Sequence, residues 1–292
     1  MDMGKLSLPA FLLQPIAEFA DEFQRLADVG RKVLANSRVA FTGLARNCDA
    51  PLSGNLAKIE QYGAACGEWR LHVETNDNVD DTVKVLEEFC GRWPQASFVD
   101  QTLGRQHYGA EFAGPRTVAL AEYRTACQMW AKAQRADIVV VLDFDAWGGC
   151  PLENFYAAVG QYSESAGVFG VAAVSIFQGR MQNVPLWMHY DCWALRLNSY
   201  WDDYTAGVGG WKYQWLPPVG SPIVPVCSAF GGMAIYDAYA YGRGIYEGSD
   251  CEHVTFHRSI AEHEHRTMGL CPSLRMLMRW ELDDAQHRVD SV

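Results

Sequence analysis

The segment Ile138-Val139-Val140-Val141-Leu142-Asp143-Phe144-Asp145 decides the fold class of this 292-residue chain. Its five leading residues are uninterrupted β-formers, which is typical of a strand buried on both faces of a helix-covered sheet. Asp143 and Asp145 follow where this strand would leave the carboxyl end of the sheet. Open α/β sheets bind their ligands at that edge, so this segment also predicts the position of a site.

The two carboxylates can share one site, because side chains two residues apart in an extended segment point the same way. Neighbouring carboxylates repel each other unless a cation lies beside them. Hard cations such as Mg²⁺ or Mn²⁺ bind one or two carboxylates together with substrate phosphates. The simpler interpretation is a polar turn after a strand, which Gly148-Gly149 would support.

Strand and helix signals alternate around this segment and indicate the fold class. We expect strands at 39–43, 69–74, 96–99 and 138–142, with helices at 52–64, 82–89 and 116–133. This order predicts an α/β fold with a mainly parallel central sheet flanked by helices and right-handed crossovers. Further along, we expect a strand at 168–176, a strand–turn–strand at 226–236, a helix at 252–264 and a strand at 269–274.

Residues 1–36 are expected to form an N-terminal helical extension. After Pro15, apolar residues recur at three- and four-residue spacing and give one apolar stripe. The stripe favours a helix packed on the rest of the chain. A homodimer through this helix, or contact with a membrane surface, are the alternatives.

Composition limits the classes of partner and compartment. The formal net charge of −11 argues against binding duplex nucleic acid, which needs clustered Lys and Arg. The nine cysteines include no C-x-x-C pair and are read as reduced thiols, which predicts a cytoplasmic protein. No apolar run approaches the ~20 residues of a transmembrane segment, and acidic residues from Glu18 onward argue against a signal peptide.

Polar residues cluster at the ends of the first two predicted strands. They are Thr42, Arg46 and Asn47 after the first strand, and Glu74, Asn76 and Asp77 after the second. Parallel strands end at the same edge of a sheet, so these side chains would converge there. Individually they suit caps and turns, whereas together they would suit a heterocycle and a ribose.

The helix before the Asp pair carries Arg116 and Arg124, eight residues apart and therefore on roughly one face. Guanidinium groups bind phosphate oxygens bidentately, so the two arginines are candidate phosphate ligands. The alternative is a solvated helix face that pairs with Glu122.

A later turn is rich in ionisable residues: Asp250, Glu252, His253 and, one helical turn on, His257. An anionic group at a helix start is favoured by the helix dipole, and a general base or a metal would fit beside it. Ordinary helix capping by Ser249 and Asp250 is the simpler explanation. His253 and His257 share a helix face, but no third ligand nearby supports a separate zinc site.

Together these segments resemble the nucleotide-sugar half of a GT-A glycosyltransferase. The type is that of microbial or viral polysaccharide enzymes, including relatives of capsule mannosyltransferases. The resemblance covers about residues 37–275, and Gly231-Gly232 and the 250–253 turn match the later glycine loop and acidic motif. It implies one GT-A-like domain at 37–292, with a Rossmann-like nucleotide-sugar half at 37–150 and an acceptor half at 151–292.

The resemblance implies metal-dependent transfer of a sugar from a nucleoside-diphosphate sugar, UDP- or GDP-linked, to an acceptor hydroxyl. A glycan, a lipid-linked sugar and a modified base are all open as acceptors. Asp143 would contact the ribose or the Mn²⁺ or Mg²⁺ ion, and Asp145 would bind the ion directly. Arg116 and Arg124 would steady the phosphates, and Thr42, Glu74 and Asp77 would face the base and ribose.

The chain departs from the family at two points. The acidic motif usually ends Glu-Asp, with the last Asp acting as base in inverting enzymes; here Glu252-His253 leaves the base open between Asp250 and Glu252. A late metal-binding histidine is also common, yet only His287 follows the 269–274 strand. His253, His257 or water would then complete the metal shell.

Two other functions fit parts of the sequence. A phosphatase of the haloacid-dehalogenase type also places Asp-x-Asp after a hydrophobic strand. That family has the motif near the start of its domain, with Thr or Val two residues past the second Asp, where this chain has Trp147. A non-catalytic carbohydrate-binding protein could keep the same fold. The aromatic residues of segment 187–215 would stack on sugars or pack in the core.

Overall fold

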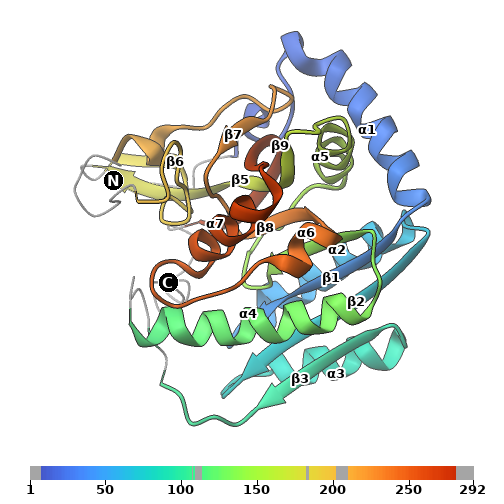
Figure 1. Cartoon of the computed structure of the whole chain (residues 1–292), viewed down its shortest axis with the longest axis vertical. Helices are drawn as coiled ribbons and strands as arrows, with labels where there is room; N and C mark the ends of the chain where they lie inside the picture. Colours follow the sequence, from blue (N-terminus) through green and yellow to red (C-terminus); the bar gives the residue numbers. More distant parts are fainter. Residues whose placement is uncertain (1–7, 107, 109–113, 182–183, 202–209, 281–292) are drawn as a thin grey trace.

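The computed structural model describes residues 8–106, 108, 114–181, 184–201 and 210–280. Their strands form a nine-stranded sheet in the order β3-β2-β1-β4-β8-β5-β9-β7, with β6 paired to β5 (Figure 1). The strands are β1 (Arg38–Ala45), β2 (Glu68–Asn76), β3 (Ala96–Gln101), β4 (Ile138–Asp143), β5 (Val168–Met181), β6 (Val184–His189), β7 (Val224–Val226), β8 (Met233–Asp237) and β9 (Thr267–Trp280).

Helices lie on both faces of this sheet (Figure 1). The α-helices are α1 (Ala20–Ala35), α2 (Asp49–Ala64), α3 (Thr82–Arg92), α4 (Pro115–Ala133), α5 (Leu152–Ser163), α6 (Ala238–Arg243) and α7 (Glu252–Glu264). Short 3₁₀ turns are η1 (Ala10–Leu12), η2 (Ala17–Phe19) and η3 (Gly210–Gln214).

The first half of the sheet confirms the predicted fold class. Strands β1 to β4 are mutually parallel in the order β3-β2-β1-β4, as the alternation of strands and helices requires. The five apolar residues of β4 are all buried, because helices cover both of its faces. The carboxyl ends of these strands meet at one edge of the sheet, and β4 delivers Asp143 to that edge.

The second half contains elements that were not predicted, namely α5, α6 and β6. The predicted strand–turn–strand at 226–236 is present only in part, since β7 ends at Val226 and β8 begins at Met233. Strand β8 runs antiparallel to its neighbours β4 and β5. The sheet is therefore mixed beyond β4, and it is mainly parallel where the Asp pair lies.

Helix α1 packs on α5 by a close backbone approach. A Cβ at Gly30 would lie 1.9 Å from the Tyr156 carbonyl oxygen, and a Cβ at Gly160 would lie 1.9 Å from that of Leu26. The apolar stripe of α1, including Phe23 and Leu26, is buried in this contact. The predicted packing of the helix on the rest of the chain is confirmed. Phe23 and Leu26 are therefore not available for the alternative dimer contact, whereas Ile16, ahead of α1, is 39% exposed.

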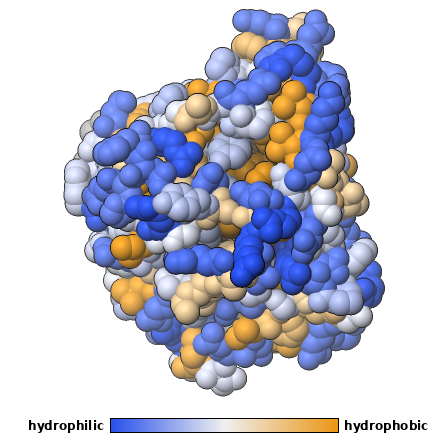
Figure 2. Space-filling view, turned by 45° about the vertical axis from the view of Figure 1, so that its right-hand side comes forward, coloured by the Kyte–Doolittle hydropathy of each residue, from blue (hydrophilic) through white to orange (hydrophobic). Residues whose placement is uncertain are grey.

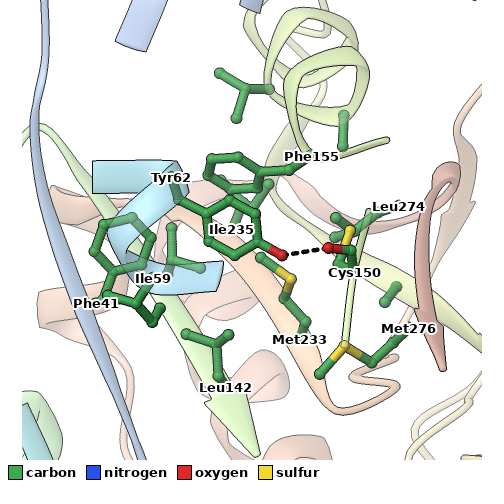
Figure 3. Close-up of a cluster of buried hydrophobic side chains, with 14 of the residues drawn as sticks. Phe41, Ile59, Tyr62, Leu142, Cys150, Phe155, Met233, Ile235, Leu274 and Met276 are labelled. Atoms are coloured by element: carbon green, nitrogen blue, oxygen red, sulfur yellow. Dashed lines mark hydrogen bonds between the residues drawn. The ribbon is translucent and has the colours of Figure 1, made fainter. Parts of the chain in front are cut away.

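Two hydrophobic clusters stabilise the two faces of the sheet. On the side of α1, α2 and α5, the Tyr62 and Phe155 rings lie 4.4 Å apart, and the Tyr62 hydroxyl donates a hydrogen bond to the Cys150 carbonyl (Figure 3). The second cluster joins the other face to α4, α6 and α7. Hydrophilic residues cover most of the outer surface seen in Figure 2, with hydrophobic surface confined to smaller patches.

None of the helices in the described part of the chain is both long and apolar enough to cross a membrane.

Candidate active site

The Asp pair lies where β4 leaves the sheet. The Asp143 amide donates a hydrogen bond to the Gly232 carbonyl (2.9 Å), and the Phe144 amide donates to that of Leu44 (3.1 Å). Phe144, which lies between the two aspartates in the sequence, is fully buried, so its packing holds the turn in place. The side chain of Asp143 remains 30% exposed, which leaves it accessible to a ligand.

The ionised form of Asp145 is disfavoured in this arrangement. Burial, and then the negative charge of Asp143, raise its pKa to about 7. Its Oδ1 atom is buried and has no hydrogen-bond partner among the described residues. A divalent cation beside the pair would neutralise both carboxylates and satisfy that oxygen, so the residues fit a Mg²⁺ or Mn²⁺ ion.

Within the described residues, no group of three or more His, Cys, Asp or Glu is arranged to hold a metal ion. Of the described residues, the two carboxylates would hold the ion, together with oxygens of the substrate or water. That ligand set is usual for Mg²⁺ bound with a phosphate-bearing substrate, because this ion dehydrates reluctantly.

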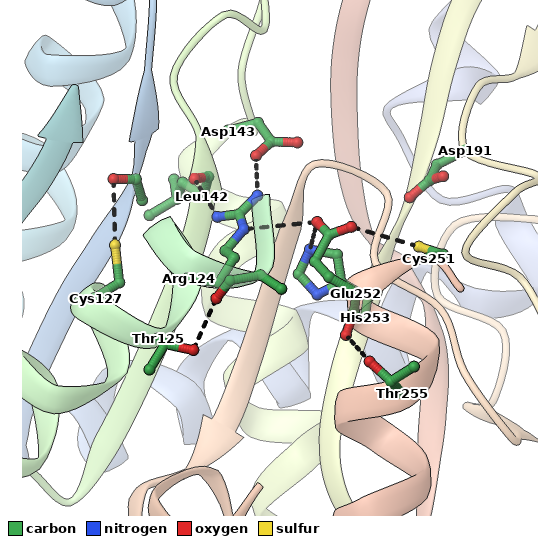
Figure 4. A network of polar contacts seen from close by, with 12 residues as sticks. Arg124, Thr125, Cys127, Leu142, Asp143, Asp191, Cys251, Glu252, His253 and Thr255 are labelled. Atoms are coloured by element: carbon green, nitrogen blue, oxygen red, sulfur yellow. Dashed lines mark hydrogen bonds and ion pairs between the residues drawn. The ribbon is translucent and has the colours of Figure 1, made fainter. Parts of the chain in front are cut away.

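Arg124 lies between Asp143 and Glu252 and contacts both carboxylates (Figure 4). Its side chain is 2% exposed, its Nη2 donates to Asp143 Oδ1, and its Nε lies 3.9 Å from Glu252 Oε1. Burial disfavours its charge, yet these two carboxylates raise its pKa above the ordinary value. Arg124 is thus committed to the two carboxylates. Direct binding of a substrate phosphate by this guanidinium stays a prediction, and its burial does not favour it.

Arg116 occupies a different position, in the first turn of α4. It is half-buried, with its guanidinium carbon 5.6 Å from the centre of the Trp193 ring. Its positive charge acts to lower the pKa values of both Asp145 and Glu252, so it faces the same space. Of the two predicted arginines, Arg116 is the less buried and therefore the more accessible candidate phosphate ligand.

Glu252 is the first residue of α7 and is 4% exposed. Burial raises its pKa, and Arg124 opposes that shift. The Cys251 thiol lies 3.9 Å from Glu252 Oε2. A buried carboxylate with a raised pKa beside the Asp pair is suited to accept a proton.

Asp250 has a different environment. It accepts a hydrogen bond from Arg196 Nη2 (3.2 Å) and another from the Cys251 amide (2.7 Å). Its side chain is 33% exposed. These contacts position the turn that leads into α7. Arg124 links Glu252, and not Asp250, to Asp143.

The two predicted histidines lie in the core. The His253 ring stacks on Phe230 with centroids 3.7 Å apart, and burial keeps its pKa well below the ordinary value. His257 is fully buried, with its ring nitrogens 2.8 Å from Ser228 Oγ and 2.9 Å from Tyr236 Oη. Metal binding by His257 stays a prediction that these contacts do not favour, because both ring nitrogens have partners. His253 is buried under Phe230 as a neutral ring, and its Nε2 lies 3.5 Å from Glu252 Oε1, so it borders that carboxylate.

Three residues predicted at the nucleotide edge hold loops in place. Asp77 accepts hydrogen bonds from the Asn76 side chain and from the backbone amides of residues 103–105, and these bonds lower its pKa to about 2. Arg46 donates to the carbonyls of residues 105 and 106. Asn47 exchanges hydrogen bonds with residues 78 and 79. These three residues position the loops at the sheet edge. None of these hydrogen bonds involves Asp143 or Asp145.

Thr42 and Glu74 lie further inside than expected. Thr42 is fully buried near the Cys127 thiol. Glu74 is 6% exposed and accepts a hydrogen bond from Gln101 (3.3 Å), with His72 Nε2 at 2.9 Å from its other oxygen. The expectation that both face a base and a ribose is not met in this structure, because α4 covers this face of the sheet.

Asp191 was missed by sequence reasoning. It follows β6, which was not predicted, and no motif marks it. It accepts hydrogen bonds from the amides of Gly231 (2.8 Å) and Ala194 (3.2 Å), and burial raises its pKa. Gly231 and Gly232 both have positive φ, and Gly232 accepts the Asp143 amide. Asp191 therefore fixes the glycine turn on which Asp143 rests, and Figure 4 shows it on the far side of Glu252 from Arg124.

Part of the expected site lies outside the described residues, namely His287 and residues 202–209 of the aromatic segment. Within the described part of that segment, Trp201 is 75% exposed and the Trp211 and Trp215 rings lie 6.0 Å apart.

Comparison with known proteins gives distant structural similarity. No protein-family model and no curated protein matches the chain. A mannosyltransferase from Pyrobaculum calidifontis, solved with GDP-Man and Mn²⁺, is 14% identical with a TM-score of 0.47, over 92% of this chain and 69% of that one. S. aureus TarS (residues 1–349) is 11% identical with a TM-score of 0.48, over 82% and 59%.

A glucosyl-3-phosphoglycerate synthase from M. tuberculosis is 18% identical with a TM-score of 0.36, over 51% of this chain and 48% of that one. The chain thus spans about half to two thirds of the length of these structures. Their TM-scores are all below 0.5, so the function is argued from the geometry of the site.

Proposed function

We propose that this protein is a metal-dependent glycosyltransferase of the GT-A type, which moves a sugar from a nucleoside-diphosphate sugar to an acceptor hydroxyl. The observation that carries the proposal is the state of Asp145. Its Oδ1 is buried without a hydrogen-bond partner in the described part of the chain, and its pKa is raised beside Asp143; both features support a cation site at the sheet edge where β4 ends.

Residues 37–150 would bind the nucleotide sugar, and residues 151–292 would form the acceptor side, with Glu252 and Asp191 contributed from the latter. Asp143 and Asp145 would hold Mn²⁺ or Mg²⁺, which when bound neutralises charge on the diphosphate leaving group. Arg116 would bind an oxygen of the same diphosphate, because its charge already reaches the pair.

Glu252 would act as the general base if transfer inverts the anomeric centre. The carboxylate would take the proton from the acceptor hydroxyl as the oxygen attacks the sugar. Burial raises its pKa, which improves its strength as a base near neutral pH. Arg124 would orient Glu252 and Asp143 together, since its guanidinium lies against both.

The proposal is tested with a panel of UDP-, GDP-, CDP- and TDP-sugars incubated with Mn²⁺, in which release of the nucleotide is measured. We expect release with at least one donor, and loss of that release with EDTA and in Asp145→Asn. Turnover that survives both would contradict the metal–diphosphate mechanism. Phosphate release from simple phosphoesters, trapped on Asp143, would instead support a phosphatase.

A further inference from the structure

A hollow of about 350 Å³ lies beside α7. This volume is at the small end of the range typical of small-molecule sites, about 300–1,000 Å³. Trp201 lines it, together with Ile245 and Glu247 of the segment between α6 and α7. The remaining lining residues share one face of α7 through their three- and four-residue spacing, and they are Thr255, Arg258, Ser259 and Glu262.

Hydrogen bonds fix the shape of this hollow. Thr255 Oγ1 accepts a hydrogen bond from the Glu247 amide (3.1 Å), and Ser259 Oγ accepts one from the Ile245 amide (2.8 Å). Between these two amides, the buried Tyr246 ring stacks on α7. The two hydroxyls therefore hold the 245–247 segment against the helix, and other groups of the lining are left to contact a ligand.

The apolar part of the lining is an exposed aromatic ring with a neighbouring aliphatic side chain. Trp201 is 75% exposed and Ile245 is 55% exposed. The guanidinium carbon of Arg258 lies over the Trp201 ring, 4.7 Å from its centre. An indole held in this way offers a flat apolar surface to a ring-shaped ligand.

The charged part of the lining consists of two carboxylates and one guanidinium. Glu247 and Glu262 are exposed, and Arg258 is half-buried. Within the described part of the chain, none of these three side chains forms an ion pair. A ligand in the hollow therefore meets two strong hydrogen-bond acceptors and one strong donor group.

These features select the chemical class of the ligand. An anion would be repelled by two carboxylates that a single guanidinium does not balance. A cation that sought the indole ring would meet Arg258, which already occupies the cation–π position. A neutral ring with hydroxyl groups meets neither obstacle. Its C–H face would stack on Trp201, and its hydroxyls would donate to the carboxylates and accept from the guanidinium.

We propose that this hollow binds a neutral saccharide, and that the acceptor of the proposed reaction is a glycan held there by sugar units away from the reacting hydroxyl. The acceptor role rests on the proposed function, whereas saccharide binding does not. Thr255 Oγ1 lies 2.9 Å from the Glu252 carbonyl oxygen, so the hollow starts one helical turn after the proposed base. At the helical rise it extends from about 4.5 Å to about 15 Å beyond Glu252 along α7.

Saturation-transfer NMR on the full chain, with EDTA and without donor, tests the binding directly. The probes are neutral disaccharides of glucose, galactose, mannose and N-acetylglucosamine, with tetramethylammonium and glucuronate as charged counterparts. We expect saturable binding of at least one neutral disaccharide at millimolar concentration. Absence of binding by every neutral probe contradicts the site, as does stronger binding of either charged probe.

Trp201→Ala should weaken the binding at least tenfold, because the stacking surface is removed. Glu262→Gln should weaken it about threefold to tenfold, through loss of a charged acceptor. Tyr239→Ala is the matched control, since Tyr239 is also an exposed aromatic residue with an arginine over its ring (Arg243, 5.3 Å) but lies outside the hollow. Equal affinity of Trp201→Ala and the parent overturns the site, and so does an equal loss in Tyr239→Ala.

The acceptor role has its own measurement, made with a donor that releases nucleotide and with the glycan that binds. Trp201→Ala should raise KM for this glycan at least tenfold and leave kcat within about twofold, because the hollow lies beside the reacting groups and not at them. An unchanged KM overturns the acceptor role alone. Glycan binding without nucleotide release from any donor would instead overturn the proposed transferase and leave the saccharide site in place.

Discussion

Arg124 and Asp143 form an ion pair that connects the protein interior to the surface of the site. The Arg124 side chain is 2% exposed, and that of Asp143 is 30% exposed. Because the same guanidinium lies 3.9 Å from Glu252, one buried cation orients the proposed metal ligand and the proposed base. The relative position of the two is therefore set by Arg124 before any substrate binds.

Arg124→Met should destabilise the protein by about 3–5 kcal/mol, since it leaves the Asp143 and Glu252 carboxylates without their buried counter-charge. Urea denaturation measures this loss. Arg92→Met, in an exposed pair with Glu60, should change stability by less than about 1 kcal/mol. Equal effects of the two substitutions would show that Arg124 is not the electrostatic centre of the site.

Asp145 predicts a characteristic pH dependence of the metal-free protein. Its pKa is about 7 in the folded state, against about 3.9 in an unfolded chain, so the folded state holds a proton that the unfolded state releases. The contribution of Asp145 to stability is therefore full below about pH 4 and is lost as the pH rises through 7. Asp145→Asn should remove this decline, so the difference in unfolding free energy between the two proteins should change across that range. A difference that is flat with pH would contradict the assigned environment.

Glu252→Gln and Asp250→Asn separate the two candidate bases. We expect Glu252→Gln to lower kcat by about 10²–10⁴-fold, because the amide cannot accept the hydroxyl proton. Asp250→Asn should lower it much less, since Asp250 is occupied by Arg196 and the Cys251 amide. The rates are read from nucleotide release with a saturating donor. The reverse order of effects would assign the base to Asp250.

His257→Gln should leave Mn²⁺ affinity unchanged within about twofold, because both ring nitrogens are used by Ser228 and Tyr236. It should lower the unfolding free energy by about 1–3 kcal/mol, the cost of unsatisfied buried partners. Titration with Mn²⁺ and thermal unfolding of the same sample provide both readings. A large loss of Mn²⁺ affinity in a stable variant would restore His257 as a ligand.

Gly30→Ala tests whether α1 belongs to the folded core. The new Cβ would meet the Tyr156 carbonyl at 1.9 Å, so we expect a loss of at least about 1–3 kcal/mol. Gly54→Ala in α2 is the control, because a Cβ there meets nothing within 4 Å; it should stabilise by about 0.5–1 kcal/mol. If both variants stabilise the protein, the contact of α1 with α5 is not formed in solution.

Local patterns predicted the elements that have one clear environment. The apolar run of β4 and the helix at 252–264 agree with the structure, because a strand covered on both faces and a helix with an acidic first turn each leave a signature in sequence. Helix α5 was not predicted for the opposite reason. Its residues 154–161 are all buried between α1 and the sheet, so it has no polar face to reveal a helical period.

The site could be predicted in its position but not in its internal contacts. The Asp pair was found because the end of a parallel strand is a topological feature. The eight-residue spacing of Arg116 and Arg124 gave no information on which of them would contact Asp143. The two arginines can be told apart only from the position of α4 against the sheet. Arg124 then contacts the end of β4, and Arg116 lies in the first turn of α4. Asp191 depends on contacts between distant segments that no local pattern encodes.

The central claim is that Asp143 and Asp145 bind a divalent cation together with a nucleoside diphosphate. Calorimetric titration of UDP and GDP into the protein, with Mn²⁺ and then with EDTA, tests it most directly. We expect one of the two nucleotides to bind with Mn²⁺ present, and to lose at least about 100-fold in affinity with EDTA or in Asp145→Asn. Nucleotide binding of equal strength under all three conditions would contradict the claim.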